Sequence, residues 1–289
     1  KLRTFTQSDL DAAARLLCPK AKSPDTLNRQ VYTPFITIWK LAVKQGWAEP
    51  REWSRPRKPK GTAIKARPTR SGTRPISYET AFQFVRAMSP APGLVMTALF
   101  YTGMRPIELF SLDAEEDDIR PADRWIVLRG SKTGAGRGIP MHDFLVPIFE
   151  WLVARGGRLF RMPNGKPYRM TEDAGGQIKG AIRSAADRTK LFGISPYTAR
   201  HTVSTPLVIN GVHPHIKDQI LGHAATDMSR RYTSVPQAPL IEAINTLPVP
   251  QGWRDLEWIR DPGTRQKLVD WRPYRTKTVH AEEKNVTST

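Results

Sequence analysis

The chain has 289 residues, 39% of them hydrophobic, and a formal net charge of +18, which suits two soluble domains that each have a core. No run of residues approaches membrane-spanning length and the first residues lack the apolar stretch of a signal peptide, which argues against a membrane protein and favours a cytoplasmic one. A single cysteine, Cys18, excludes an intramolecular disulfide and a cysteine-based zinc site, and the positive charge predicts a nucleic-acid partner.

Residues 1–54 are predicted to be helical and resemble the end of a small helical domain that clamps DNA. One helix opens at Ser8 and Asp9, and apolar residues at helical spacing predict a longer helix from about Thr26 to Lys44. Because the sequence does not begin with Met, we expect this domain to be truncated at its N-terminus. A solvated helix face is the simpler interpretation of any one polar residue here, but the candidate phosphate contacts are Asn28, Arg29 and Lys40.

Residues 55–75 are predicted to form a basic linker between two domains. From Arg55 to Arg74 the sequence has eight Lys and Arg but no Asp or Glu, together with several Pro and Gly, and such a composition cannot bury a core. A cationic tether would neutralise DNA phosphates and release counterions, which gives sequence-independent, salt-sensitive affinity. An idle spacer is the alternative. The candidate DNA contacts are Arg57, Lys58 and Lys60.

Residues 76–247 are predicted to form a second domain, mainly helical with one small antiparallel β-sheet. Ser77 caps a first helix, and the apolar run from Gly93 to Tyr101 predicts a buried one. The next helix has Pro106 at its first position, so that Glu108 lies at its third. From there the Glu108 carboxylate can reach back to the backbone of Arg105 or hold the Arg105 guanidinium.

A β-hairpin is predicted from the two apolar segments 124–128 and 139–141, joined by a glycine-rich tip. The tip carries Lys132 and Arg137 but matches neither the P-loop nor the dinucleotide-binding pattern. Lys132 is therefore a candidate flexible lysine beside a phosphate, and Arg137 is a candidate DNA contact. The acidic residues 115–118 are adjacent rather than convergent, which predicts a solvated loop and no cation site.

Two further helices are predicted, one over 146–153 and one from Thr171 to about Gly193. Ser195 and Pro196 then read as the cap and first position of a helix that carries Arg200 one turn inside. This helix contains Pro206, which should kink its backbone.

A second short helix follows from about Pro214 and ends at Gly222, which presents His223 just past a helix C-terminus. Tyr232 comes nine residues later. His213 and His215 look like a pair of ligands, but nothing nearby completes a metal site, so we expect none. A last short helix is predicted over 239–247, and residues 248–289 receive no role.

Five side chains that are far apart in the sequence make one complete set for phosphoryl transfer: Arg105, Lys132, Arg200, His223 and Tyr232. The barrier of this reaction is lowered mainly by positioning and by cations around the phosphate. In these residues the chain resembles the tyrosine recombinase (phage integrase) family. The motifs that carry the resemblance are Thr102–Leu109 for the first arginine box, Ser131–Gly134 for the hairpin lysine, Arg200–Thr202 with Leu221–His223 for the second box, and Tyr232–Thr233 for the nucleophile.

The resemblance implies a role for each of these residues in a catalytic domain over 76–247. Arg105 and Arg200 would clamp the scissile phosphate, with Glu108 orienting Arg105. Tyr232 would attack the phosphate to give a 3′-phosphotyrosyl intermediate. Because this intermediate conserves the bond energy, rejoining the strand would need neither ATP nor metal nor other cofactor. Lys132 would protonate the departing 5′ oxygen and His223 would hydrogen-bond the phosphate.

The same resemblance implies a homotetramer that acts on two sites in double-stranded DNA, in the cytoplasm of a bacterium and associated with its nucleoid. Two positions depart from the family pattern. Tyr197 stands where histidine is usual, and a phenol is a poor base at neutral pH. Pro206 lies inside the helix that carries Arg200 and should shift it. Two alternatives stay open, a DNA-binding relative with impaired catalysis and an enzyme like type IB topoisomerases.

Overall fold

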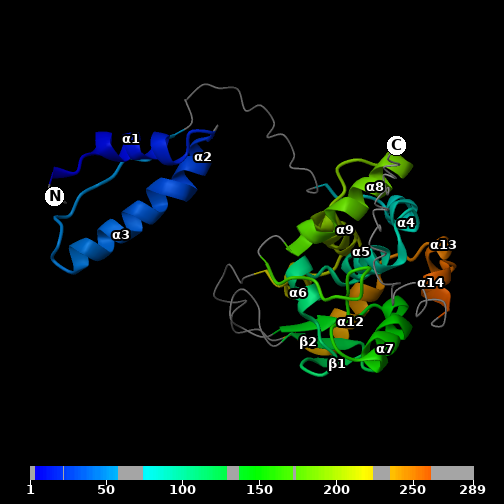
Figure 1. Cartoon of the computed structure of the whole chain (residues 1–289). Coiled ribbons are helices and arrows are strands. Elements are labelled where there is room, and N and C mark those ends of the chain that lie inside the picture. The colour runs from blue at the N-terminus through cyan, green and yellow to red at the C-terminus, as the bar shows by residue number, and fades with distance from the viewer. Residues whose placement is uncertain are drawn as a thin grey trace, which may run out of the picture. The chain divides into compact units, whose positions relative to one another are not determined.

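The structure, a computed structural model, describes residues 4–21, 23–57, 74–128, 137–171, 174–223 and 235–261. The chain divides into two compact units, residues 1–68 and 69–289 (Figure 1). Both units are mainly helical, and the second also holds a small antiparallel sheet, which is the fold class predicted from the sequence.

The first unit is a small helical body whose long second helix has a widened turn near its start. Its helices are α1 (Gln7–Leu17), α2 (Pro24–Leu27), the π-helical turn η2 (Asn28–Tyr32) and α3 (Thr33–Lys44). The first helix begins earlier than predicted, because Thr6 and Asp9 form a reciprocal capping box in which the Asp9 carboxylate accepts from the Thr6 backbone N–H at 2.8 Å.

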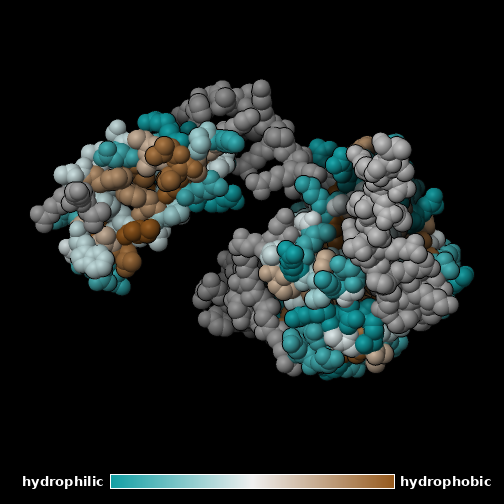
Figure 2. All heavy atoms as spheres, viewed as in Figure 1, coloured by the Kyte–Doolittle hydropathy of each residue, from teal (hydrophilic) through white to brown (hydrophobic). Residues whose placement is uncertain are grey.

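Residues 45–57 return along the first unit and complete its core. The Trp39 indole donates to the Glu49 carbonyl oxygen at 3.2 Å, and Trp53 packs edge-on against Trp39 with ring centroids 4.9 Å apart. Near the end of this segment, Gln7 exchanges two hydrogen bonds with the Ser54 backbone. Large hydrophobic side chains also remain on the surface of this unit (Figure 2), namely Leu16, Leu17, Ile38, Leu41 and Trp47.

The core of the second unit is built around one helix that is apolar on every side. Every residue of α5 (Pro90–Thr102) from Ala91 onward is buried, which is expected of a helix without a polar face. The helices α4 (Tyr78–Arg86) and α9 (Pro196–Ile209) pack against it, and α6 (Pro106–Ser111) follows it directly. The predicted cap of α4 is present, because Ser77 accepts from the Thr80 backbone N–H at 3.1 Å.

The sheet contains the predicted hairpin and one additional strand. Strands β2 (Trp125–Leu128) and β3 (Arg137–Pro140) are antiparallel, with Leu128 paired to Arg137 and Trp125 to Pro140. The third strand, β1 (Asp118–Arg120), pairs with β2, so the acidic stretch is not simply a solvated loop. Its Asp117 carboxylate instead accepts from the Asp113 backbone N–H at 2.9 Å and closes the turn before the strand.

The remaining predicted helices are present with different limits. The first is α7 (Val146–Arg155), which follows the 3₁₀ turn η3 (Asp143–Leu145). The helix expected from Thr171 to about Gly193 is instead a 3₁₀ turn, η4 (Ala174–Ile178), followed by α8 (Lys179–Thr189). This helix ends early because Lys190 adopts a left-handed conformation with φ of 61°.

The second unit extends beyond the C-terminal limit that the sequence indicated. Helix α12 (Gln237–Asn245) lies against β3, and two short helices, α13 (Gln251–Arg254) and α14 (Glu257–Arg260), follow it. Trp253 is fully buried and its indole donates to the Thr97 hydroxyl at 3.0 Å. Residues 248–261, for which no role was predicted, therefore belong to this core. Within the described ranges, none of the helices is both long enough and apolar enough to cross a membrane.

Candidate active site

The site begins with a carboxylate at the N-terminus of α6. Because Pro106 fixes the start of this helix, Glu108 lies at its third position and both predicted contacts form. Its Oε2 atom accepts from the Arg105 backbone N–H at 2.8 Å, and its Oε1 atom accepts from Arg105 Nη1 at 2.9 Å. Glu108 is buried, whereas Arg105 keeps 32% of its side chain exposed. The Arg105 side chain thus stays partly open to solvent while Glu108 holds its Nη1 atom.

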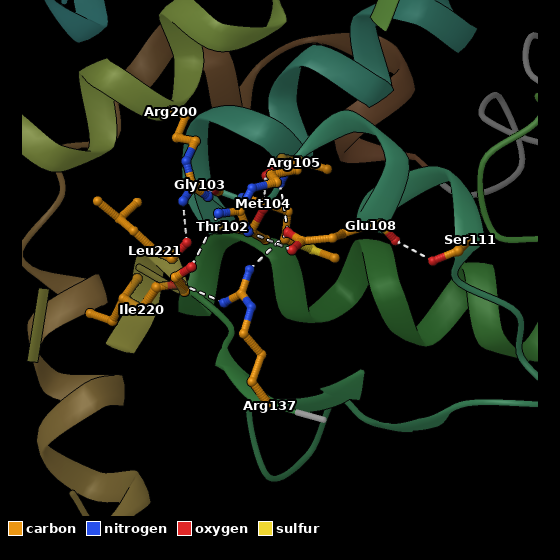
Figure 3. Close-up of polar contacts among 12 residues, drawn as sticks. Thr102, Gly103, Met104, Arg105, Glu108, Ser111, Arg137, Arg200, Ile220 and Leu221 are labelled. Carbon is orange, nitrogen blue, oxygen red and sulfur yellow. Dashed lines mark hydrogen bonds and ion pairs between the residues drawn. The ribbon is translucent and has the colours of Figure 1, made fainter. Parts of the chain in front are cut away.

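A second arginine reaches the same carboxylate from the β-hairpin. Arg137, the first residue of β3, donates from Nη2 to Glu108 Oε2 at 2.8 Å and from Nη1 to the Ile220 carbonyl oxygen at 2.8 Å (Figure 3). Only 14% of its side chain is exposed. The sequence predicts Arg137 as a DNA contact. In the structure its side chain is turned inward, because Arg137 and the buried Ile139 lie on the same face of the strand.

Arg200 reaches the site from α9, whose predicted cap at Ser195 is present with the Thr198 backbone N–H donating at 3.4 Å. Its guanidinium is mostly buried and donates to the Gly103 carbonyl oxygen at 2.6 Å and to the Leu221 carbonyl oxygen. Pro206 lies inside α9, yet the helix continues past it to Ile209.

The three arginines meet at the C-terminus of α10 (Pro214–Leu221). Consecutive carbonyl oxygens at this helix end accept from different guanidinium groups: Ile220 from Arg137, Leu221 from Arg200, and Gly222 from Arg105 at 3.1 Å. The last carbonyls of a helix have no partner within it, and the partial negative charge there attracts cations. The helix end therefore assembles the arginines of three distant segments.

The cluster carries an excess of positive charge, because three guanidinium groups surround the single carboxylate of Glu108. Burial works against ionisation of Glu108, but Arg137 and the hydrogen bonds from Arg105 outweigh it and hold the pKa of this carboxyl below its usual value. Burial, helped by Arg105 and Arg137, lowers the pKa of Arg200 to about 10, which leaves it charged at neutral pH. Such a site suits an anion.

His223 lies just past the end of α10, as predicted, and is about half exposed. Its Nδ1 atom is 3.2 Å from Asp218 Oδ1, and Lys217 Nζ lies 3.4 Å from the same oxygen. Burial raises the pKa of Asp218, but the contacts with His223 and Lys217 outweigh it and lower that pKa overall. Asp218 therefore orients the His223 ring and leaves Nε2 for another partner.

Sequence reasoning did not identify Asp218. The available signal is an acidic residue in the last turn of a short helix, where the helix dipole disfavours it, so that a compensating partner is expected. Tyr197, the residue at the usual histidine position, is on the first turn of α9 with 52% of its surface exposed. The other two predicted catalytic residues, Lys132 and Tyr232, lie outside the described residues.

The DNA-contact candidates of the first unit differ in their surroundings. Asn28 donates to the Pro56 carbonyl oxygen at 3.1 Å and is partly buried, which gives it a structural contact. Arg29, Lys40 and Arg57 are exposed, while Lys58 and Lys60 lie outside the described residues. Of the two histidines that resemble a ligand pair, His213 caps α10 and His215 contacts Gln219.

Comparisons with known proteins agree on one family. The sequence profile of the phage integrase family matches residues 78–238. Tyrosine recombinase XerD of Mycobacterium tuberculosis is 29% identical over 151 residues, which cover 49% of this chain and 47% of XerD, so the chain spans about half the length of that relative. Tyrosine recombinase XerC of Corynebacterium efficiens is 28% identical over 256 residues, which cover 84% of this chain and 77% of XerC.

A solved structure shares the fold. The Tn1549 transposon integrase in complex with circular intermediate DNA superposes with a TM-score of 0.57 at 18% identity, covering 84% of this chain and 85% of that chain. At such low identity the likeness concerns the arrangement of helices around the small sheet, and it agrees with the fold class expected from the sequence.

Proposed function

The chain belongs to the phage integrase family, whose profile matches more than half of it, and from this premise we propose that it is a site-specific DNA recombinase of the integrase type. It would cleave and rejoin DNA through a 3′-phosphotyrosyl intermediate. This activity requires a cationic pocket for a phosphodiester and a nucleophile that can reach it.

The observation that carries the proposal is the meeting of Arg105, Arg137 and Arg200 at one helix end. Three buried or half-buried cations repel one another, and the single carboxylate of Glu108 does not neutralise them. An anion placed against the partly exposed Arg105 side chain would relieve that repulsion. A DNA phosphate is the anion that agrees with the net charge of +18.

Each reacting group has a defined task in this proposal. The Tyr232 oxygen forms a bond to phosphorus and its hydroxyl proton passes to solvent water, while the bond from phosphorus to the 5′ oxygen breaks and Lys132 gives that oxygen a proton. Arg105 and Arg200 stabilise the charge on the other phosphate oxygens, and His223 hydrogen-bonds one of them. The phosphotyrosyl bond retains the energy of the original diester, so the reverse reaction reseals the strand.

The proposed partner is double-stranded DNA, and the proposed assembly is a homotetramer on two DNA sites. The candidates to bind the backbone of the duplex are the exposed Arg29, Lys40 and Arg57, together with Lys58 and Lys60 of the predicted basic linker. Phosphate contacts of this kind position a protein on DNA without reading its sequence.

A nicked suicide substrate tests the proposal, with the duplex taken from the repeats that flank the gene. We expect a protein–DNA adduct that resists denaturation, is formed by the wild type and is absent in Tyr232→Phe. No adduct with any flanking sequence, despite salt-sensitive DNA binding, would favour the catalytically impaired relative. Relaxation of supercoils without exchange between sites would favour the topoisomerase-like enzyme.

A further inference from the structure

The Glu108 carboxylate is held by two arginines that come from opposite directions. Its Oε2 atom accepts from the Arg105 backbone and from Arg137 Nη2, both at 2.8 Å, while Oε1 accepts from Arg105 Nη1 at 2.9 Å. Figure 3 shows Arg137 rising from the hairpin toward Glu108, on the side away from Arg200. Because a carboxylate can rotate about its last side-chain bond, a second donor on Oε2 fixes the plane in which it presents Oε1 to Arg105.

Arg137 is itself fixed at several points. Its backbone pairs with Leu128 in the sheet, and its Nη1 atom donates to the Ile220 carbonyl oxygen. Gly222 leaves room for it, since a Cβ atom at that position would lie 2.5 Å from Arg137 Nε. The hairpin, α6 and the end of α10 are therefore connected through one guanidinium group.

We propose that Arg137 is a positioning residue of the strand-cleavage reaction, which sets the orientation of Arg105 through their shared carboxylate, Glu108. This inference rests on the proposed function. Arg137 acts through Glu108 and not on the DNA, because only 14% of its side chain is exposed. Arg105 is more exposed and is the residue that would meet the phosphate.

A purely structural ion pair predicts a different outcome. In that case, loss of Arg137 would lower the stability of the fold but leave the chemistry of the folded molecules unchanged. A positioning residue instead changes the rate of the chemical step more than it changes DNA affinity, because the phosphate-binding groups remain but are misaligned. The two interpretations separate when rate, affinity and stability are measured together.

The experiment compares Arg137→Gln and Arg137→Lys with Arg120→Gln, a matched control that removes an exposed arginine of the same sheet paired with Asp118. Adduct formation is followed under single-turnover conditions on the suicide substrate at saturating protein, with DNA affinity and thermal unfolding measured alongside. For Arg137→Gln we expect a cleavage rate about 10- to 100-fold lower, in the range found when a supporting residue is removed, and DNA affinity within about 3-fold. Arg137→Lys keeps the charge but not the paired donors, so it should restore part of the rate.

A double-mutant cycle identifies the route of the effect. If Arg137 acts through Glu108, the combined loss in Arg137→Gln with Glu108→Gln is clearly smaller than the product of the single losses. Independent, multiplicative effects overturn the inference, and so does a wild-type cleavage rate in Arg137→Gln. If Arg137→Gln does not fold, Arg137→Lys decides by the same criteria. If the wild type forms no adduct, the proposed function fails together with this inference. If the wild type forms the adduct and Arg137→Gln cleaves at the same rate, only this inference fails.

Discussion

Arg200 Nη1 donates to the carbonyl oxygen of Gly103 at 2.6 Å, across a separation of 97 residues. This bond connects α9 to the turn between α5 and α6, and Gly103 permits it by adopting φ of 63°. A Cβ atom at Gly103 would lie 2.8 Å from Leu221, whose carbonyl oxygen is the second acceptor of Arg200. The two arginine segments of the site are thus joined through backbone groups before any DNA is bound.

Arg200→Lys should weaken both the fold and the reaction. A lysine ammonium lacks the planar fork that contacts Gly103 and Leu221 together, so one buried carbonyl loses its donor, at a cost of about 1–3 kcal/mol. The free energy of unfolding and the rate of adduct formation both measure this. Arg188→Lys, on the exposed face of α8, is the control and should change neither. Equal stability of the two variants would contradict the role given to the Gly103 contact.

Gly222→Ala should destabilise the second unit more than Gly211→Ala. Both glycines have left-handed backbone conformations, with φ of 63° and 73°, and so share a strain of about 1–2 kcal/mol on substitution. Only at Gly222 would the new Cβ meet a neighbour, Arg137, whereas the space around Gly211 is open. Denaturant unfolding of the two variants isolates the contact. If their midpoints shift equally, Arg137 is not held against the end of α10.

His142 should make the fold less stable as the pH falls. Its Nδ1 atom accepts from the Phe144 backbone N–H at 2.9 Å, so the neutral ring donates from Nε2 to the Leu247 carbonyl oxygen at 3.1 Å. Burial lowers the pKa of His142 despite the opposing effect of Leu247. Because the folded-state pKa lies below the unfolded value, this contribution is complete above about pH 6.5 and is lost as the pH falls through the folded pKa.

Unfolding free energies between pH 7 and pH 5 test this dependence. In the wild type the slope contributed by one such group is at most about 1.4 kcal/mol per pH unit. His142→Gln should flatten the dependence, while the exposed His201→Gln should leave it as in the wild type. An unchanged slope in His142→Gln would show that other groups cause the acid sensitivity.

Trp253→Ala should destabilise the second unit by about 3–5 kcal/mol, as expected for a large cavity in a core. The indole is fully buried among Tyr78, Phe100 and Tyr101, and its loss also leaves the Thr97 hydroxyl without this partner. Calorimetry that resolves the two units gives the measurement. Trp47→Ala, which removes a mostly exposed indole from the first unit, should change stability by less than about 0.5 kcal/mol. If Trp253→Ala changed the stability as little as Trp47→Ala, residues 248–261 would lie outside the core.

Features that depend on neighbours within about four residues could be predicted from the sequence. The caps at Ser77 and Ser195, the reach of Glu108 back to Arg105, and the helix end at Gly222 follow from local hydrogen bonding and from the conformations open to Pro and Gly. Two helix limits were predicted wrongly, because neighbouring residues compete to begin or end the same helix. Thr6 rather than Ser8 caps the first helix, and Lys190 ends α8 before Gly193.

The sequence by itself determined most of the helices and which of their faces are apolar, because hydrophobic period and capping depend on residues close together in the chain. It also predicts that remote Arg, Lys, His and Tyr residues form one chemical set. Only the tertiary structure decided that Arg137 turns inward to Glu108, that the end of α10 collects three arginines, and that Trp253 fills the core beside Thr97. These contacts join segments tens to more than a hundred residues apart. They form because buried charges and helix ends must be hydrogen-bonded by groups from other segments of the packed unit. A local sequence pattern does not show which segments these are.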